Sequence, residues 1–291
     1  MSSPSLGERA LGAYLGFACG DAFGAPVEFL TPGEIQATHR LLTTMVGGGW
    51  LHLAPGQVTD DTQMALALGR AILAGPDWEV RRVCEQFALW LRGKPLDVGH
   101  TCRRGIRRFI VEGTLAGPPN EGDAGNGAAM RNLPVVLASL SDPAAFRHWT
   151  LEQCHVTHNH PLSDAATLTL GRMTRRLLTG EGKDGAWMEA QALVAAHPDF
   201  RFSPYRGISS AYVVDTVQTV FHYFFASHTF GDCLIGTANQ GGDADTTSAI
   251  AGMLAGAHYG IANIPNRWLS RLEAGAVREI RDQTPRLLEW K

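Results

Sequence analysis

Apolar side chains recur every three or four residues through most of this 291-residue chain, a spacing that lines them along one face of an α-helix. Alternating runs of β-branched and aromatic residues between tight turns, which are typical of strands, are scarce. The sequence therefore predicts an all-α fold built from many helices. We expect helices over residues 6–19, 62–73, 80–91, 101–112, 132–140, 162–178, 186–196, 209–226, 230–239, 246–259 and 265–274.

The segments between these helices are rich in glycine and carry most of the polar residues of interest. We expect loops at residues 20–26, 46–56, 115–127 and 240–245. No proline- or serine-rich linker, block of charge or change in composition divides the chain. We therefore expect one domain over residues 1–291.

Charge and cysteine content exclude several classes of function. The chain has 25 Lys and Arg against 28 Asp and Glu, a formal net charge of −3, so no overall positive field attracts nucleic acid. Its 5 cysteines are scattered and form no CxxC pair, which indicates neither a disulfide framework nor a cysteine zinc site. No run of apolar residues is long enough to cross a membrane. We expect a cytoplasmic protein with no nucleic-acid partner and no direct membrane insertion.

A first acidic cluster, Thr59, Asp60 and Asp61, stands just before an expected helix. Asp60 and Gln63 have the spacing of a helix capping box, so capping is one interpretation of this cluster. A cap needs only one carboxylate, however, and two adjacent acids repel each other unless water or a cation offsets their charge. Cation binding is therefore the second interpretation.

A second cluster, Asp243, Asp245 and Thr246, repeats the pattern after two glycines. Carboxylate and hydroxyl oxygens are the ligands that Mg²⁺ and Mn²⁺ prefer, whereas zinc prefers histidine and cysteine. If the two clusters meet, four carboxylates carry too much charge for one such ion but suit two ions about 3.5–4 Å apart. Two independent helix caps that lie far apart remain the alternative.

Three further features are candidates for a site. The glycine-rich loop around Gly125, Asn126 and Gly127 leads into an expected helix, so its backbone N–H groups can converge on an anion; an ordinary loop is the alternative. Glu28 is a candidate base or outer metal ligand, or else an exposed loop acid. His158 is a candidate contact for a ribose or phosphate, or else a structural histidine.

These motifs occur in the order found in the ADP-ribosylglycohydrolase family, which the sequence resembles over nearly its whole length. The residues that carry the resemblance are 20–22, 58–62, 125–131, 157–158 and 241–247. Further segments resemble the family members that act on dinitrogenase reductase, namely residues 47–50, 97–99, 103–108 and 212–215. Each motif alone is weak evidence, but the ordered set is highly specific.

The resemblance implies a roughly orthogonal all-α fold around a centre of two Mn²⁺ or Mg²⁺ ions. The ligands that it implies are Thr59, Asp60, Asp61, Asp243, Asp245 and Thr246. It implies catalytic roles for Asp97, which would reach the bond being broken, for Glu28 near the centre, and for Asp60. The ADP-ribose contacts that it implies are Gly125, Asn126, Gly127 and His158, with Tyr212 as an aromatic group on the adenine side.

The activity that the resemblance implies is hydrolysis of the N-glycosidic bond between ribose and an arginine of dinitrogenase reductase, which reactivates nitrogenase. One alternative is hydrolysis of another ADP-ribose linkage, such as an ester on serine or acetate. A non-enzymatic ADP-ribose-binding module is the other alternative, and the presence of all the expected metal ligands argues against it. The resemblance also implies regulation by a PII signalling protein and reversible recruitment to an ammonium channel at the membrane.

Overall fold

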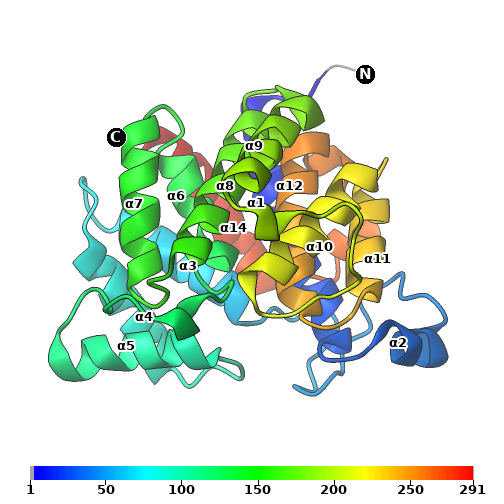
Figure 1. The fold of residues 1–291 in the computed structure, drawn as a ribbon, viewed down its shortest axis with the longest axis horizontal. Coiled ribbons are helices and arrows are strands. Elements are labelled where there is room, and N and C mark those ends of the chain that lie inside the picture. The colour runs from blue at the N-terminus through cyan, green and yellow to red at the C-terminus, as the bar shows by residue number, and fades with distance from the viewer. Residues whose placement is uncertain (1–2, 291) are drawn as a thin grey trace.

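The computed structural model describes residues 3–290, and within that range the fold is all-α, as the sequence predicts. Helices account for 67% of the chain, and the described residues form no strand beyond two isolated bridges. The α-helices are α1 (Leu6–Gly24), α2 (Pro32–His39), α3 (Asp60–Leu73), α4 (Val80–Arg92), α5 (His100–Glu112), α6 (Leu133–Ala138), α7 (Pro143–His155), α8 (Pro161–Leu178), α9 (Gly182–Ala196), α10 (Val213–Ala226), α11 (Phe230–Asn239), α12 (Ala244–Tyr259), α13 (Asn266–Leu269) and α14 (Ala274–Glu289) (Figure 1).

The centre of the fold is a close packing of α1 against α12, whose glycines recur at four-residue intervals. These glycines and their small partners pair along the two helices as Gly12 with Gly256, Gly16 with Gly252, Gly20 with Ser248, and Gly24 with Ala244. A Cβ atom added to Gly20 would lie 1.9 Å from the Ser248 carbonyl oxygen. The two backbones therefore touch, which only residues without bulky side chains permit.

The prediction of a loop at residues 20–26 is wrong, because these glycines are needed for the packing of α1 against α12. Gly20 and Gly24 lie within α1, and Ala25–Val27 form a short 3-10 helix directly after it. These glycines serve helix packing and not a turn. The extra helical residues place Asp21 inside α1, completely buried, close to the start of α3.

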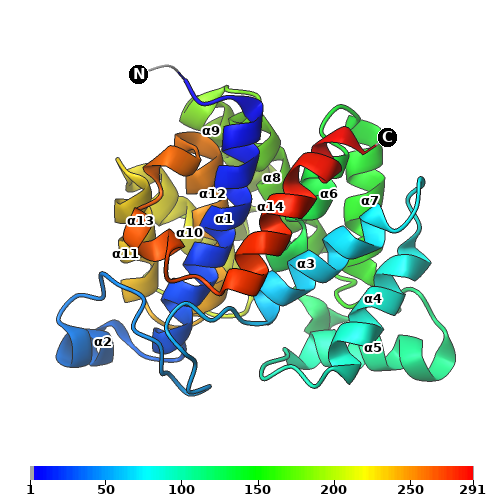
Figure 2. The same cartoon turned by 180° about the vertical axis from the view of Figure 1, so that it is seen from behind.

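Helices α14 and α3 pack beside this central pair, and Figure 2 shows α14 between α1 and α3 on the rear face. The sequence predicts neither α2, α7 nor α14, and the helix that it predicts over residues 265–274 is only α13, Asn266–Leu269. Proline inside a helical pattern argues against a helix, and Pro285 lies inside α14. Burial of Ile280 and Leu287 against the core outweighs that cost.

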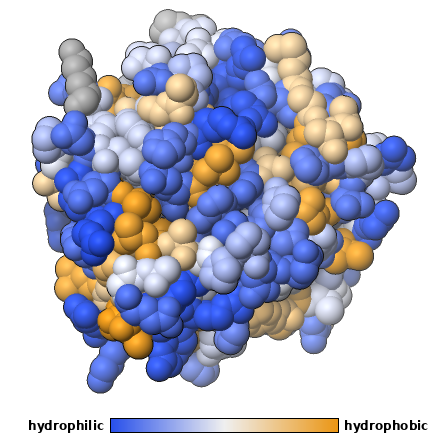
Figure 3. Space-filling view, turned by 60° about the vertical axis from the view of Figure 1, so that its left-hand side comes forward, coloured by the Kyte–Doolittle hydropathy of each residue, from blue (hydrophilic) through white to orange (hydrophobic). Residues whose placement is uncertain are grey.

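Buried apolar side chains from Ala10 to Leu287 form one connected cluster. All five cysteines are buried with free thiols. Figure 3 shows apolar side chains as separate patches among hydrophilic ones on one face of the molecule. Within residues 3–290, no helix is both long and apolar enough to span a membrane. A single domain over residues 1–291 stays a prediction.

Candidate active site

Helix α3 begins with a cap that comes from another helix. Its N-cap residue, Thr59, makes no capping bond with its side chain. Instead the Asp21 carboxylate on α1 accepts hydrogen bonds from the backbone N–H groups of Thr59 and Thr62, at 3.1 and 3.2 Å, and from their hydroxyls at 2.8 and 2.5 Å. Asp21 thus performs the capping at this helix start, so the side chains of Asp60 and Asp61 are not needed for it.

The N-cap residue of helix α12, Asp243, likewise makes no capping bond with its side chain. The two acidic clusters meet instead: the Thr246 hydroxyl donates to Asp61 Oδ2 at 3.2 Å, across 185 residues of sequence. The Asn126 side-chain amide donates to Asp243 Oδ2 and, at 2.9 Å, to the Thr216 hydroxyl. Two distant helix caps are therefore the wrong interpretation of these clusters.

One carboxylate oxygen at this junction has no partner. Asp61 is 1% exposed, and its Oδ1 atom is buried without a hydrogen bond from any described residue. An unpaired buried carboxylate oxygen is costly, because it has lost its water and gained nothing in return. Cations would remove that cost.

Burial and mutual repulsion raise the pKa values of the clustered acids. Burial is the main cause at each acid: it raises the pKa of Asp60 and of Glu28 to about 8, and that of Asp243 to about 6. The pKa values of Asp61 and Asp245 are raised well above the ordinary range of an aspartate by burial and then by neighbouring carboxylates. So many acids in one buried volume are typical of a site for divalent cations.

The clusters open into a cavity of about 390 Å³. The predicted site residues that line it are Glu28, Asp60, Asp61, Asp97, Gly125, Asn126, Gly127, His158, Asp243, Asp245 and Thr246. One carboxylate oxygen from each of Glu28, Asp97 and Asp245 lies within 4.8 Å of the others. Asp60 also accepts a hydrogen bond from the Gly99 backbone N–H at 3.4 Å, which ties the Asp97 loop to α3.

Two predicted site residues do not line this cavity. The Thr59 side chain is buried and donates to Asp21, with Asp61 Oδ2 at 3.5 Å. Tyr212 is 44% exposed, and its backbone forms an isolated bridge with that of Gly125.

The glycine-rich loop approaches His158 so closely that side chains would not fit there. A Cβ atom on Gly127 would lie 2.7 Å from His158 Cε1, and one on Gly125 would lie 3.1 Å from His158 Nε2. The loop is fixed from outside, because the Asn126 backbone N–H donates to Ala211 O at 3.1 Å and the Ser163 hydroxyl contacts Gly125 O at 2.8 Å. The Asn126 N–H is thus already paired, so it is not free to bind an anion.

His158 is a neutral hydrogen-bond donor in this environment. Burial, with the charges of Arg131 and Arg104, lowers the pKa of His158 to about 3. Arg131 donates to the Thr157 hydroxyl at 2.8 Å, and that hydroxyl forms a hydrogen bond with His158 Nδ1 at 2.7 Å. The other ring nitrogen, Nε2, lies beside Gly125 and Gly127.

Three residues that shape this site have no role predicted from the sequence: Asp21, Arg131 and Trp50. Asp21 caps α3. Arg131 is completely buried and holds the Thr157 hydroxyl, which is hydrogen-bonded to His158. The Trp50 indole N–H donates to Glu28 Oε2 at 2.6 Å. All three lie in segments that carry the family resemblance, which is the signal that could have identified them.

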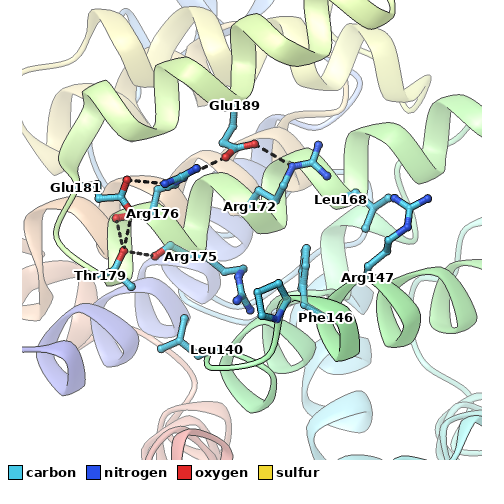
Figure 4. A pocket seen from close by; sticks show the side chains of 11 residues that line it. Leu140, Phe146, Arg147, Leu168, Arg172, Arg175, Arg176, Thr179, Glu181 and Glu189 are labelled. Atoms are coloured by element: carbon cyan, nitrogen blue, oxygen red, sulfur yellow. Dashed lines mark hydrogen bonds and ion pairs between the residues drawn. The ribbon is translucent and has the colours of Figure 1, made fainter.

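A larger cavity, of about 480 Å³, lies elsewhere, between α7, α8 and α9. Figure 4 shows Glu189 placed between two arginines on its wall, and its carboxylate accepts from Arg172 and Arg176 at 2.9 and 3.0 Å. None of the predicted site residues lines it. We therefore place the candidate active site in the smaller, acidic cavity.

The chain is similar to known proteins over nearly its whole length. The family model described as ADP-ribosylglycohydrolase matches residues 2–290. The ADP-ribosyl-[dinitrogen reductase] glycohydrolase of Rhodospirillum rubrum is 59% identical over 99% of this chain and 98% of its own length. The ADP-ribosylarginine hydrolase Tri1 of Serratia proteamaculans (strain 568) is 30% identical over 91% of this chain and 75% of its own length.

A solved structure, described as an ADP-ribosylglycohydrolase-related protein complex, superimposes with a TM-score of 0.86 at 31% identity. The match covers 98% of this chain and 99% of that one. Both the sequence and the fold therefore place this chain in the ADP-ribosylglycohydrolase family.

Proposed function

We propose that this chain is a metal-dependent hydrolase that removes ADP-ribose from an arginine of dinitrogenase reductase and so reactivates nitrogenase. The Rhodospirillum rubrum relative, at 59% identity over nearly the full length of both chains, supports this substrate. The Serratia relative supports an arginine linkage over an ester. The single observation that carries the proposal is the contact of Asp61 with Thr246, at 3.2 Å, which joins the two acidic clusters at the wall of one cavity.

The donor set suits two Mn²⁺ or Mg²⁺ ions, because it consists of hard oxygen atoms and includes the unpartnered Oδ1 atom of Asp61. The residues that would hold them are Thr59, Asp60, Asp61, Asp243, Asp245 and Thr246. When bound, such ions supply positive charge for the ribose hydroxyls and lower the pKa of a water molecule.

Three acids would serve the reaction itself. Hydrolysis breaks the bond between ribose C1 and a guanidine nitrogen and joins a water oxygen to C1, while a proton must reach the leaving guanidine. Burial raises the pKa of Asp97, so that this side chain can orient the guanidinium and exchange a proton with it. Glu28, beside the centre, would accept a proton from the attacking water, and Asp60 would help to orient that water from within the ligand set.

The rest of the ADP-ribose would bind along the glycine loop. No Lys or Arg belongs to the cavity wall among the residues that the structure describes. We assign the diphosphate and ribose to the backbone of Gly125 and Gly127 and to Nε2 of His158. Asn126, which also supports Asp243, and Tyr212, whose backbone is bridged to Gly125, would complete the contacts.

We further propose a cytoplasmic, single-domain enzyme over residues 1–291. Its regulation would follow the family resemblance, with a PII signalling protein as a partner and an ammonium channel as a reversible membrane anchor. No nucleic acid is among the proposed partners.

Release of free ADP-ribose from modified dinitrogenase reductase tests this function. We expect release with Mn²⁺ and none after chelation. Binding of ADP-ribose without release would instead favour a binding module, and release only from a serine-linked substrate would favour hydrolysis of an oxygen linkage.

The variant Asp97→Asn separates catalysis from metal binding. We expect its kcat to fall about 100-fold or more, because the amide can no longer exchange a proton with the guanidine. The Mn²⁺ content should stay at the wild-type value, since Asp97 is outside the proposed ligand set. Unchanged turnover would remove Asp97 from the mechanism.

A further inference from the structure

The wall of the acidic cavity includes an indole ring that is both anchored and accessible. Trp50 lines the cavity, and its N–H donates to Glu28 Oε2 at 2.6 Å. The Phe29 ring packs against it, with centroids 5.6 Å apart at an angle of 46°. Trp50 nevertheless remains 50% exposed, so much of its ring surface is free to contact a ligand.

The Phe29 ring that packs against Trp50 is carried by a firmly held backbone. Residue Phe29 has a φ of +65°, which a residue with a side chain rarely adopts. Two hydrogen bonds to Gly242 hold that segment, from Phe29 N to Gly242 O at 2.7 Å and from Gly242 N to Leu30 O at 2.9 Å. Strained backbone of this kind persists where its surroundings enforce it, often at functional sites. The Trp50 and Phe29 pair is thus tied to the start of α12.

The charges beside Trp50 favour a cation. Glu28 touches the indole, and its carboxylate lies within 4.8 Å of one oxygen each of Asp97 and Asp245. Trp50 and Asp97 line the same cavity, so a planar guanidinium bound there can meet both an aromatic ring and a carboxylate. Guanidinium groups stack on aromatic faces and pair with carboxylates through the same flat group.

Building on the proposed function, we propose that Trp50 and Asp97 form the subsite for the guanidinium of the modified arginine. Trp50 is then a specificity-determining residue, because the leaving group of an oxygen-linked ADP-ribose carries no such cation. Its ring favours the arginine linkage and adds nothing to binding of ADP-ribose itself. The hydrogen bond from its N–H to Glu28 is a separate contact that positions these two side chains.

Two variants of Trp50 separate the ring from the N–H. Trp50→Phe keeps an aromatic face but loses the hydrogen bond to Glu28, whereas Trp50→Leu loses both. The control is Trp187→Leu, since Trp187 on α9 is also half-exposed, at 43%, and packs edge-on to Phe225 outside the cavity. The substrates are ADP-ribosyl-arginine and an ADP-ribosyl-serine peptide, assayed with Mn²⁺, and free ADP-ribose serves as a competitive inhibitor.

We expect Trp50→Leu to lower the arginine-to-serine ratio of kcat/KM about tenfold, the size of a partly desolvated cation–π contact, while Trp50→Phe keeps it within about threefold. The control should keep the wild-type ratio, and the inhibition constant of ADP-ribose should change less than kcat/KM for the arginine linkage. An equal fall of the ratio in both Trp50 variants, no fall in either, or a matching loss of ADP-ribose affinity would overturn the proposal.

If the serine peptide is not cleaved, the test rests on kcat/KM for ADP-ribosyl-arginine, which should fall in Trp50→Leu and be largely kept in Trp50→Phe. A wild-type enzyme that releases ADP-ribose from neither ADP-ribosyl-arginine nor modified dinitrogenase reductase would contradict the proposed function itself. That outcome differs from a failed Trp50 test.

Discussion

Replacing Asp61 by asparagine should stabilise the metal-free protein while abolishing its response to metal. The change replaces a carboxyl group whose ionised form is disfavoured by burial and by neighbouring acids, and whose Oδ1 atom has no partner. Relief of that cost raises the free energy of unfolding by about 1–3 kcal/mol. The same change removes a proposed ligand shared between the clusters, so we expect kcat with Mn²⁺ to fall at least about 100-fold.

Thermal unfolding with and without Mn²⁺ checks this prediction. Wild-type Tm should rise on addition of Mn²⁺, and the Asp61→Asn variant should show no such rise. Asp282→Asn is a suitable control, because Asp282 is an exposed carboxylate paired only with Arg286 on the surface of α14. An Asp61→Asn protein that keeps both the Mn²⁺-induced rise in Tm and its turnover would show that Asp61 binds no metal.

The variant Gly20→Ala should destabilise the whole fold. Its Cβ atom would lie 1.9 Å from the carbonyl oxygen and 2.4 Å from the carbonyl carbon of Ser248, both backbone atoms of α12. Neither atom can rotate away, so α1 and α12 must separate. We expect a loss of about 3 kcal/mol or more in the free energy of unfolding, measured by urea denaturation.

The same helix supplies a matched control for this prediction. Gly7 lies in the first turn of α1, and a Cβ atom added there would meet nothing within 4 Å. Gly7→Ala should therefore leave stability unchanged or raise it by up to about 1 kcal/mol, as alanine favours helix over glycine. Equal stabilities for the two variants would contradict the close packing of α1 on α12.

The chemistry of the site was predictable from the sequence because it depends on residue types at short spacing. Asp60 and Asp61, like Asp243 and Asp245, each place two carboxylates beside a helix start, and that pattern indicates oxygen ligands wherever the helices lie. What brings them together could not be predicted in the same way. The contact of Asp61 with Thr246 spans 185 residues and depends on the packing of α1, α3 and α12.

Local patterns misled where tertiary packing decided the outcome. The glycines at 20 and 24 suggest a loop by composition, yet they continue α1 because α12 needs their small size. Asp21 could not be recognised as the cap of α3 before its position on α1 was known. Pro285 likewise argues against a helix in the sequence of α14, although the apolar face of this helix packs against the folded core.

The most direct test of the binuclear centre is anomalous X-ray diffraction from crystals of the Mn²⁺-loaded protein, recorded just above the manganese absorption edge. We predict two manganese peaks, both among the side-chain oxygens of the clusters that contain Asp61 and Asp245. A map with no peak between those clusters, or with manganese only elsewhere on the chain, would contradict the account.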